Sequence, residues 1–319
     1  MRFAFIDAPV LVTGATGFVG SNLTRRLLQE QAEVHLLVRE QSDLWRLEGV
    51  VDQVHLHRVD LGEASRLRDV ISTIKPSVIY HCVAFGGYPD ERDPQAMIEA
   101  NVRGTLNLLQ AAAVAPQAWV INTGSSSEYG MKSAPMKEDD RLEPISVYGV
   151  TKAAATLFCQ MTARATRQPI VTTRLFSPYG PYEHSARLIP SVIRSCLLGH
   201  APDVTSGEQV RDFIFIDDVV DCFLRIPGAS LQPGDVLNVG SGRQTSVRGV
   251  IQQIVELCGT SVQPRWGAIP RRPNETTTWV ADLSKVTTNL GWRPATSLDE
   301  GLRKTIAWFS AHMSLYACA

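Results

Sequence analysis

Tyr148 and Lys152 are the two side chains whose types and spacing most clearly predict chemistry. Four positions separate them in Tyr148-Gly149-Val150-Thr151-Lys152, so on a helix they lie on one face within reach of each other. A free phenol is a poor acid or base at neutral pH, but a neighbouring ammonium group favours the phenolate and lowers the pKa of the phenol. The pair therefore predicts a tyrosine that exchanges a proton with a substrate hydroxyl or carbonyl group.

A group of hydroxyl side chains follows the apolar run at residues 118–122. The run predicts a strand, and Thr123-Gly124-Ser125-Ser126-Ser127 stands at its carboxyl end. Open α/β sheets place their ligand crevice at this end of their strands. A hydroxyl group there can hydrogen-bond the substrate oxygen and stabilise the charge that develops on it. The sequence thus predicts that a serine of this segment assists the tyrosine.

A glycine-rich turn lies between a predicted strand at residues 10–13 and a predicted helix at residues 21–30. Its spacing is GxxGxxG, which allows a tight turn and lets the backbone approach a pyrophosphate at the helix N-terminus. An ordinary strand-to-helix turn is the alternative interpretation, but the strand and helix on either side favour a dinucleotide site. The predicted cofactor contacts of the turn are Gly14, Thr16, Gly17, Phe18, Val19 and Gly20.

The ends of the next two predicted strands bear on which dinucleotide fits. A carboxylate at the end of the second strand would bind the ribose 2′-hydroxyl of NAD, whereas a cation would accept the 2′-phosphate of NADP. Arg39 stands there and favours NADP(H), while Glu40 beside it keeps NAD(H) possible. After the third strand, Asp60 is placed to accept a hydrogen bond from the adenine amino group, next to Leu61.

Short β-branched runs alternate with helical patterns through the first half of the chain. Strands are predicted at residues 33–39, 54–58, 77–82, 118–122 and 170–175 in addition to 10–13, and helices at residues 94–115 and 146–166. Parallel neighbours need crossover connections, and the crossover helices cover both faces of the sheet. We therefore expect an α/β fold of the Rossmann type, with a doubly wound parallel sheet.

The character of the sequence changes after Leu175, where segments rich in Pro and Gly separate short elements. Residues 235–239 predict a further strand that rejoins the main sheet. We expect residues 1–175, with about 234–260, to form the dinucleotide-binding domain. Residues 176–233 and 261–319 would then mainly form a smaller, discontinuous C-terminal lobe that binds the substrate.

The composition excludes several classes of partner. Among 319 residues, 31 Lys and Arg balance 32 Asp and Glu, so no basic field predicts nucleic acid binding. No apolar run approaches the roughly 20 residues of a membrane span, and the scattered cysteines fit a reducing cytoplasm. His55 and His57 share a strand face, but no third ligand follows at a suitable spacing, so no metal site is predicted.

With these motifs in this order, the chain resembles the extended short-chain dehydrogenases/reductases, in particular the nucleotide-sugar epimerases, dehydratases and reductases. The similarity covers nearly the whole chain and implies that Ser125, four residues before Tyr129, is the catalytic serine beside Tyr148 and Lys152. Further matching segments are Asn101-Val102-Arg103-Gly104-Thr105, residues 174–181, residues 211–218, Asn238-Val239-Gly240, Arg272-Pro273 and residues 290–294.

The resemblance also implies the remaining contacts. The cofactor would meet Ala84 and Asn101, and Lys152 would hold the nicotinamide ribose. Arg211 and Arg272 would clamp the diphosphate of a nucleotide sugar, since bidentate guanidinium contacts suit that task. Ser126 and Ser177 would line the sugar site, and residues 85–88 and 182–184 are expected to contact the sugar. The helices at residues 94–115 and 146–166 would form a homodimer interface.

The reaction is narrowed by the residues before Tyr129. Relatives that act as 4,6-dehydratases usually carry an acidic residue two places before this tyrosine, where the chain has Ser127, and Glu128 stands one place too late. The residues around Tyr129, namely 124–130, 135–139 and 144–149, resemble those of reductases that act on nucleotide-linked 4-keto-6-deoxyhexoses. Together with Arg39, this resemblance favours an NADPH-dependent reductase of such a sugar. A 4-epimerase that retains NAD is the alternative. A non-catalytic dinucleotide-binding relative is a distant third, because the Ser, Tyr and Lys are all present.

Overall fold

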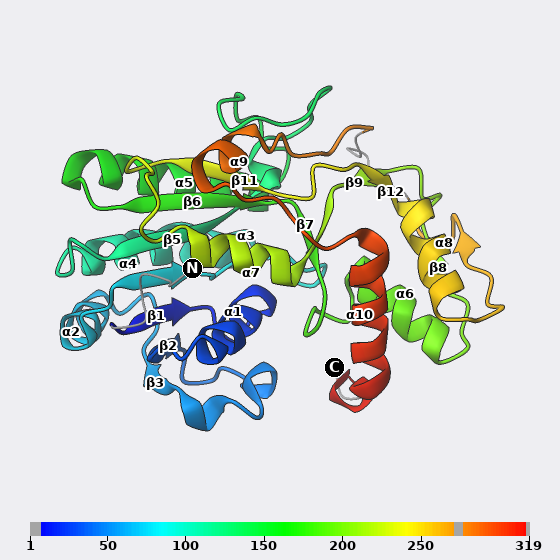
Figure 1. Cartoon of the computed structure of the whole chain (residues 1–319), viewed down its shortest axis with the longest axis horizontal. Coiled ribbons are helices and arrows are strands. Elements are labelled where there is room, and N and C mark those ends of the chain that lie inside the picture. The colour runs from blue at the N-terminus through cyan, green and yellow to red at the C-terminus, as the bar shows by residue number, and fades with distance from the viewer. Residues whose placement is uncertain (1–7, 271–276, 317–319) are drawn as a thin grey trace.

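The computed structural model describes residues 8–270 and 277–316, and these contain a seven-stranded parallel sheet. The strand order is β11-β6-β5-β4-β1-β2-β3, so the direction of winding reverses between β1 and β4 (Figure 1). This confirms the predicted doubly wound sheet of the Rossmann type. Its strands are β1 (Val10–Thr13), β2 (Val34–Val38), β3 (His55–Arg58), β4 (Val78–His81), β5 (Trp119–Ser125), β6 (Ile170–Leu175) and β11 (Val236–Val239).

Most strands of the sheet are buried along their whole length, as continuous apolar runs predict. Every residue of β1, β2, β4, β6 and β11 is buried, whereas β3 at the sheet edge is partly exposed. The crevice of a doubly wound sheet lies beyond the carboxyl ends of the strands at the point of reversal. Here that point is the end of β1, where the glycine turn begins.

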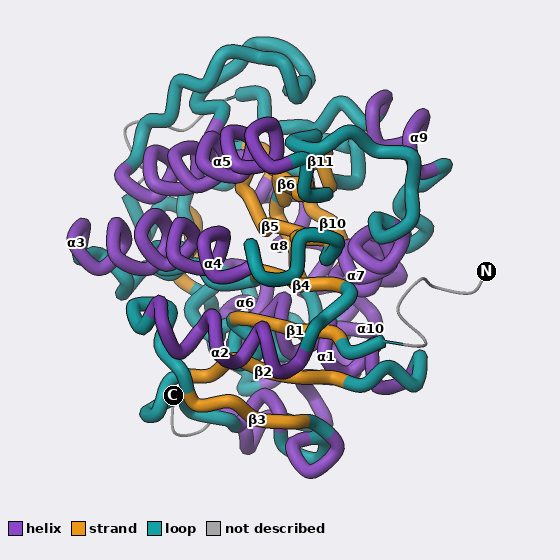
Figure 2. Tube along the Cα trace, turned by 90° about the vertical axis from the view of Figure 1, so that its left-hand side faces the viewer, coloured by secondary structure: helices purple, strands orange, loops and turns teal. Residues whose placement is uncertain are grey.

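Helices cover both faces of this sheet (Figure 2). The helices α1 (Phe18–Gln29) and α7 (Ile216–Arg225) contact each other and cover one face of the sheet. They contribute to the hydrophobic cluster that contains Leu23, Leu36 and Val220. The opposite cluster contains Leu11, Ile71 and Leu109. It is built by α2 (Ala64–Ile74), α4 (Gly104–Ala112) and α5 (Val147–Thr166). None of the helices in the described ranges is long and apolar enough to cross a membrane.

The predicted helix at residues 94–115 is interrupted. It consists of α3 (Pro94–Met97), a π-helical segment (Ile98–Arg103) and α4. A π-helical segment widens the turn and often marks a functional site. Here it carries Asn101, which is fully buried and hydrogen-bonded to the loop after β4. The widened turn thus accompanies the inward position of this side chain.

A smaller group of elements lies to the right of the sheet in Figure 1. Its helices are α6 (Leu188–Leu197), α8 (Val247–Leu257) and α10 (Leu298–Ala311), which pack against one another. Three strand pairs accompany them: β7 (Ser177–Tyr179) with β10 (Phe213–Phe215), β9 (Val210–Arg211) with β12 (Thr245–Ser246), and β8 (Asp203–Val204) with β13 (Arg265–Trp266). The helix α9 (Ser284–Leu290) lies beside β11.

These contacts refine the expected division of the chain. The helix α7 falls within residues 176–233 but packs on α1, whereas α8 falls within residues 234–260 but packs on α6 and α10. We therefore propose that α7 belongs to the dinucleotide-binding domain and α8 to the substrate lobe. The lobe would then consist of residues 176–215, 240–270 and 291–316, in three pieces of chain.

Candidate active site

Ser125 and Tyr148 meet where β5 ends and α5 begins. Ser125 is the last residue of β5, and Tyr148 stands in the first turn of α5. The helix begins there because Ser146 is its N-cap, with the Ser146 hydroxyl accepting a hydrogen bond from the Gly149 N–H at 3.0 Å. Burial raises the pKa of Tyr148 to about 12, and the hydrogen bond with Ser125 and the charge of Arg187 act in the opposite direction. The phenol is therefore protonated at neutral pH and has a serine beside it.

Lys152 lies one helical turn further along α5. Its side chain is buried, and its Nζ has no hydrogen-bond partner among the described residues. Burial lowers the pKa of Lys152, while the carboxylate of Glu128 raises it. A buried donor without a partner costs free energy, which a ribose hydroxyl group would offset. The site around Lys152 therefore fits a dinucleotide.

The backbone of the glycine turn after β1 also fits a dinucleotide. Gly14 has φ +71°, and a Cβ atom there would lie 2.7 Å from the backbone of Cys82. A Cβ atom on Gly20 would overlap the carbonyl oxygen of Gly14, so helix α1 can approach the turn only with glycine at this position. Gly17 is the N-cap of α1 and has no side chain to occupy the first N–H groups. These N–H groups are thus available to an anion such as a pyrophosphate.

Asn101 fixes the loop that follows β4. Its Oδ1 accepts a hydrogen bond from the Phe85 N–H at 2.8 Å, and its Nδ2 donates to the Phe85 carbonyl at 2.7 Å and to Thr151 Oγ1 at 3.0 Å. The side chain thus connects the loop to α5, which carries the tyrosine and the lysine. Ala84, the residue before Phe85, is exposed at this loop.

At the ends of β2 and β3, Arg39 and Asp60 are exposed, and Leu61 is partly buried. The guanidinium group of Arg39 has no hydrogen bond or ion pair within residues 8–270 and 277–316, whereas Glu40 lies 4.0 Å from the guanidinium of Arg58. Asp60 Oδ1 accepts a hydrogen bond from the Gly62 N–H at 2.7 Å, and the Leu61 carbonyl accepts one from Asn107 at 2.8 Å. The turn after β3 is therefore held in place without using the second carboxylate oxygen of Asp60.

Two of the predicted substrate residues are joined through a tryptophan. Ser126 is buried, and its hydroxyl accepts a hydrogen bond from Trp279 Nε1 at 3.1 Å. The guanidinium of Arg211 lies 5.4 Å from the centre of the Trp279 ring. Ser177 begins β7, with its N–H donating to the Asp212 carbonyl. Arg272 lies outside the described residues.

The two stretches expected to contact the sugar lie against each other. The Tyr88 ring stacks on His184 with 4.4 Å between ring centres, and Arg187 donates from Nη1 to the Gly87 carbonyl at 3.1 Å. Arg187 also pairs with Glu183 at 3.4 Å. The sequence analysis did not single out Arg187, although its charge acts on the pKa of Tyr148. Glu183 and Arg187 precede α6 and are not helical, so no helical spacing in the sequence marks the pair.

Comparison with known proteins identifies the chain. A model of the NAD dependent epimerase/dehydratase family matches residues 10–240. The chain belongs to this family. It is 31% identical over 310 residues to a UDP-glucose 4-epimerase of Mycolicibacterium smegmatis, an alignment that covers 94% of this chain and 97% of the relative. It is 27% identical over 326 residues to a dTDP-glucose 4,6-dehydratase of Xanthomonas campestris, covering 94% and 92%.

A solved structure is similar to this chain over nearly its whole length. The UDP-glucuronic acid 4-epimerase of Bacillus cereus, crystallised with UDP-glucuronic acid and NAD, matches with a TM-score of 0.86 and 27% identity, covering 95% of this chain and 99% of that one. The resemblance to extended short-chain dehydrogenases/reductases of the nucleotide-sugar kind is thereby confirmed. The chain is an enzyme of the NAD dependent epimerase/dehydratase family.

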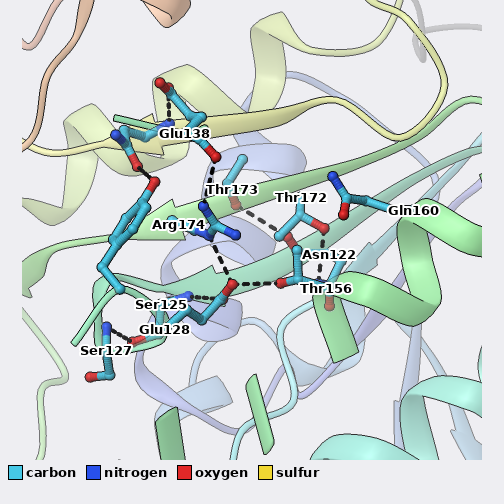
Figure 3. A network of polar contacts seen from close by, with 12 residues as sticks. Asn122, Ser125, Ser127, Glu128, Glu138, Thr156, Gln160, Thr172, Thr173 and Arg174 are labelled. Atoms are coloured by element: carbon cyan, nitrogen blue, oxygen red, sulfur yellow. Dashed lines mark hydrogen bonds and ion pairs between the residues drawn. The ribbon is translucent and has the colours of Figure 1, made fainter. Parts of the chain in front are cut away.

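A buried carboxylate lies directly behind Ser125. Glu128, directly before Tyr129, is fully buried, and Figure 3 shows it at the centre of a polar network. Its Oε1 accepts a hydrogen bond from the Ser125 N–H at 2.8 Å. Its Oε2 accepts from Thr156 Oγ1 at 2.9 Å and from Arg174 Nε at 2.8 Å. Both oxygens of the Glu128 carboxylate are therefore already hydrogen-bonded, and one of them holds the Ser125 N–H.

The network continues from Arg174 to β11. The Arg174 guanidinium lies 4.5 Å from the centre of the Tyr129 ring, and the Tyr129 hydroxyl donates to Asn238 Oδ1 at 2.6 Å. Asn238 Nδ2 in turn donates to the Met136 carbonyl at 2.8 Å. These contacts connect the segment that follows β5 to β6 and β11, close to Ser125. The sequence analysis named Tyr129, Arg174 and Asn238 but did not predict that they pair.

Proposed function

We propose that the protein reduces the 4-keto group of a nucleotide-linked 4-keto-6-deoxyhexose with NADPH. The observation that carries hydride transfer at C4 is the arrangement of Ser125, Tyr148 and Lys152, with a protonated phenol beside a serine and a buried lysine that lacks a partner among the described residues. Two observations argue against dehydration. Ser126 and Ser127 stand three and two residues before Tyr129 in place of acidic residues, and the carboxylate of Glu128 is already bound to Arg174. Arg39 supports the choice of NADPH.

In this proposal the chain's own residues handle the proton and the substrate oxygen. The bound nicotinamide supplies the hydride. Ser125 hydrogen-bonds the C4 oxygen, and Tyr148 donates the proton from its Oη as charge develops there. Lys152 binds the nicotinamide ribose, and its charge favours the phenolate that Tyr148 becomes. The network behind Glu128 keeps Ser125 in place during the step.

The same proposal assigns the binding residues. The turn from Gly14 to Gly20 receives the pyrophosphate, with Thr16, Gly17, Phe18 and Val19 at its contacts, and Arg39, Asp60 and Leu61 receive the adenosine. Asn101 serves the cofactor by fixing the loop that contains Ala84. Ser126, Ser177, Arg211 and Arg272 bind the nucleotide sugar, with Trp279 placing Ser126 beside Arg211.

Epimerisation at C4 with retained NAD is the second candidate. The Mycolicibacterium and Bacillus relatives are 4-epimerases, and the Bacillus enzyme holds NAD. The same three residues would serve both reactions, because an epimerase must also transfer a hydride to and from C4. What distinguishes the two is whether the dinucleotide leaves after each turnover.

A single assay separates these candidates. Purified protein is mixed with nucleotide-linked 4-keto-6-deoxyhexoses, and nicotinamide absorbance is followed with NADPH and separately with NADH. Stoichiometric loss of NADPH supports the reductase. Loss of NADH alone retains the reductase and overturns the choice of cofactor. Interconversion of UDP-hexoses without consumption, with NAD released from the denatured protein, establishes the epimerase instead.

Replacing Arg39 tests the choice of cofactor. We expect Arg39→Ala to raise the Kd for NADPH by about 10- to 100-fold, the size of a charge-assisted hydrogen bond, and to leave the Kd for NADH nearly unchanged. Fluorescence titration of each cofactor gives both constants. Arg68→Ala on the exposed face of α2 is the matched control and should change neither. A tighter Kd for NADH than for NADPH in the unaltered protein would contradict the proposal.

We also propose that the protein is a homodimer through α5 and the segment Ile98–Arg103. Four apolar side chains on α5 are about half exposed, namely Val147, Val150, Leu157 and Met161, and Ile98 is 41% exposed. Several exposed apolar side chains on one helix are typical of a protein interface. The α5 helix packs directly on the π-helical segment, so these side chains belong to one part of the surface.

Light scattering after size exclusion checks this proposal. The unaltered protein should have about twice the chain mass of 35.0 kDa. Leu157→Glu combined with Met161→Glu should yield monomers, because two carboxylates would be buried at the interface. Leu198→Glu, at an equally exposed leucine at the end of α6, should leave the dimer intact. If the unaltered protein had the mass of a monomer, the proposed dimer would be contradicted.

A further inference from the structure

Four side chains that can bind a metal gather on one face of β2 and β3. His35 and His55 are directly paired in the parallel register of the two strands. Glu33 stands two residues before His35 and His57 two residues after His55, and side chains two apart on a strand share a face. The sequence analysis considered only His55 and His57, because the other two residues come from the neighbouring strand.

This cluster lies far along the strands from the cofactor turn. Glu33 precedes the first residue of β2 and His55 begins β3, whereas the glycine turn follows the last residue of β1. Because the strands are parallel, the cluster and the turn lie at opposite ends of the sheet. The edge strand β3 forms one boundary of the sheet (Figure 2).

The distances suit a small divalent metal ion. His35 Nε2 lies 3.0 Å from Glu33 Oε1, and a ligand atom of His55 lies within 4.8 Å of the ligand atoms of both. Tetrahedral zinc with bonds of about 2.0–2.1 Å places its ligand atoms roughly 3.3 Å apart. The first pair is slightly closer than this, at hydrogen-bonding distance, so a small shift of the exposed Glu33 side chain would let both atoms bind one ion. The rings of His35 and His55 are stacked 4.6 Å apart, so the exposed His55 ring must tilt to complete the site.

His57 occupies the remaining nitrogen of His35. His57 Nε2 lies 2.9 Å from His35 Nδ1, so one ring of this pair donates and the other accepts. A histidine that binds a metal through one nitrogen usually donates its other N–H to a neighbouring acceptor. The arrangement of His35 is thus the one a metal ligand requires.

We propose that Glu33, His35 and His55 bind one divalent transition-metal ion of the zinc type, with His57 as the residue that positions His35. Two imidazoles and a carboxylate suit Zn²⁺, and a water molecule would take the fourth position. The Glu33 side chain is 55% exposed, so this position faces solvent. The ion would fasten the edge strand β3 to β2. It takes no part in hydride transfer, so the proposal is independent of the substrate.

The test uses the untagged full-length protein, stripped of metal. Titration with Zn²⁺ against a chromogenic chelator should give one tight site per chain, and Co²⁺ should give the visible absorption of a tetrahedral site. We expect His55→Gln to weaken Zn²⁺ binding at least 100-fold, and His57→Gln about 10- to 100-fold, as outer partners of ligands do. His200→Gln, at another exposed histidine, is the matched control.

His55 is exposed, so its replacement should leave the fold intact, which circular dichroism verifies. Binding should also raise the unfolding temperature of the unaltered protein and not that of His55→Gln. Equal Zn²⁺ binding by the unaltered protein and His55→Gln would overturn the proposal. So would the absence of a tight site in the unaltered protein.

Discussion

Replacing Tyr148 by phenylalanine is expected to lower kcat by about 10²- to 10⁴-fold, the usual contribution of a positioned acid or base. The substitution removes only the hydroxyl that would protonate the C4 oxygen. The ring keeps its place in the first turn of α5, so the Kd for the dinucleotide should stay close to that of the unaltered protein. Nicotinamide absorbance measures kcat, and fluorescence titration measures the Kd.

A matched control comes from another buried tyrosine. Tyr80 in β4 has its hydroxyl 3.5 Å from the Phe223 carbonyl, on the side of the sheet that α7 covers. Tyr80→Phe should therefore leave kcat nearly unchanged. If both variants kept full activity, Tyr148 would not be the proton donor and the proposed chemistry would fail.

Replacing Ser125, which is hydrogen-bonded to Tyr148, should change how the activity depends on pH. The hydrogen bond with Ser125 lowers the pKa of Tyr148, so Ser125→Ala should raise that pKa. In the direction of reduction the tyrosine acts as the acid, and activity is lost as the pH rises through its pKa. The alkaline limb of the pH profile should therefore move to higher pH in Ser125→Ala.

Features formed by neighbours in sequence could be predicted from the sequence. The glycine turn, the strand before it and the pair Tyr148 and Lys152 depend on spacing within one or two elements. Their positions in the structure match the expected ones, with α5 beginning within one residue of the predicted start. The serine-rich segment also lies at the predicted strand end.

Features that depend on pairing between distant residues could not be predicted from the sequence. Glu128 and Arg174 are 46 residues apart, and only the parallel register of β5 and β6 brings them together. Likewise His35 meets His55 through the register of β2 and β3. Arg187 reaches the loop after β4 from a segment 100 residues further along the chain. Local patterns carry no information about such registers.

Breaking the buried ion pair of Glu128 and Arg174 should lower the stability far more than breaking an exposed ion pair. The side chains are 0% and 3% exposed, so removing one leaves the other charge buried without its partner. Arg174→Met is expected to lower the free energy of unfolding by about 3–5 kcal/mol. Urea denaturation measures it. Arg303→Met, which breaks the solvent-exposed pair with Asp299 on α10, should change it far less, because water screens that pair.

Replacing both charges separates what the pair does for folding from what it does for catalysis. Glu128→Leu combined with Arg174→Met removes both charges from the interior, so the double variant should be more stable than Arg174→Met alone. Its activity should stay low, because the Ser125 N–H loses the carboxylate that holds it. If activity returned together with stability, Glu128 would serve only the fold. If stability returned without activity, the carboxylate would be the group that positions the catalytic serine.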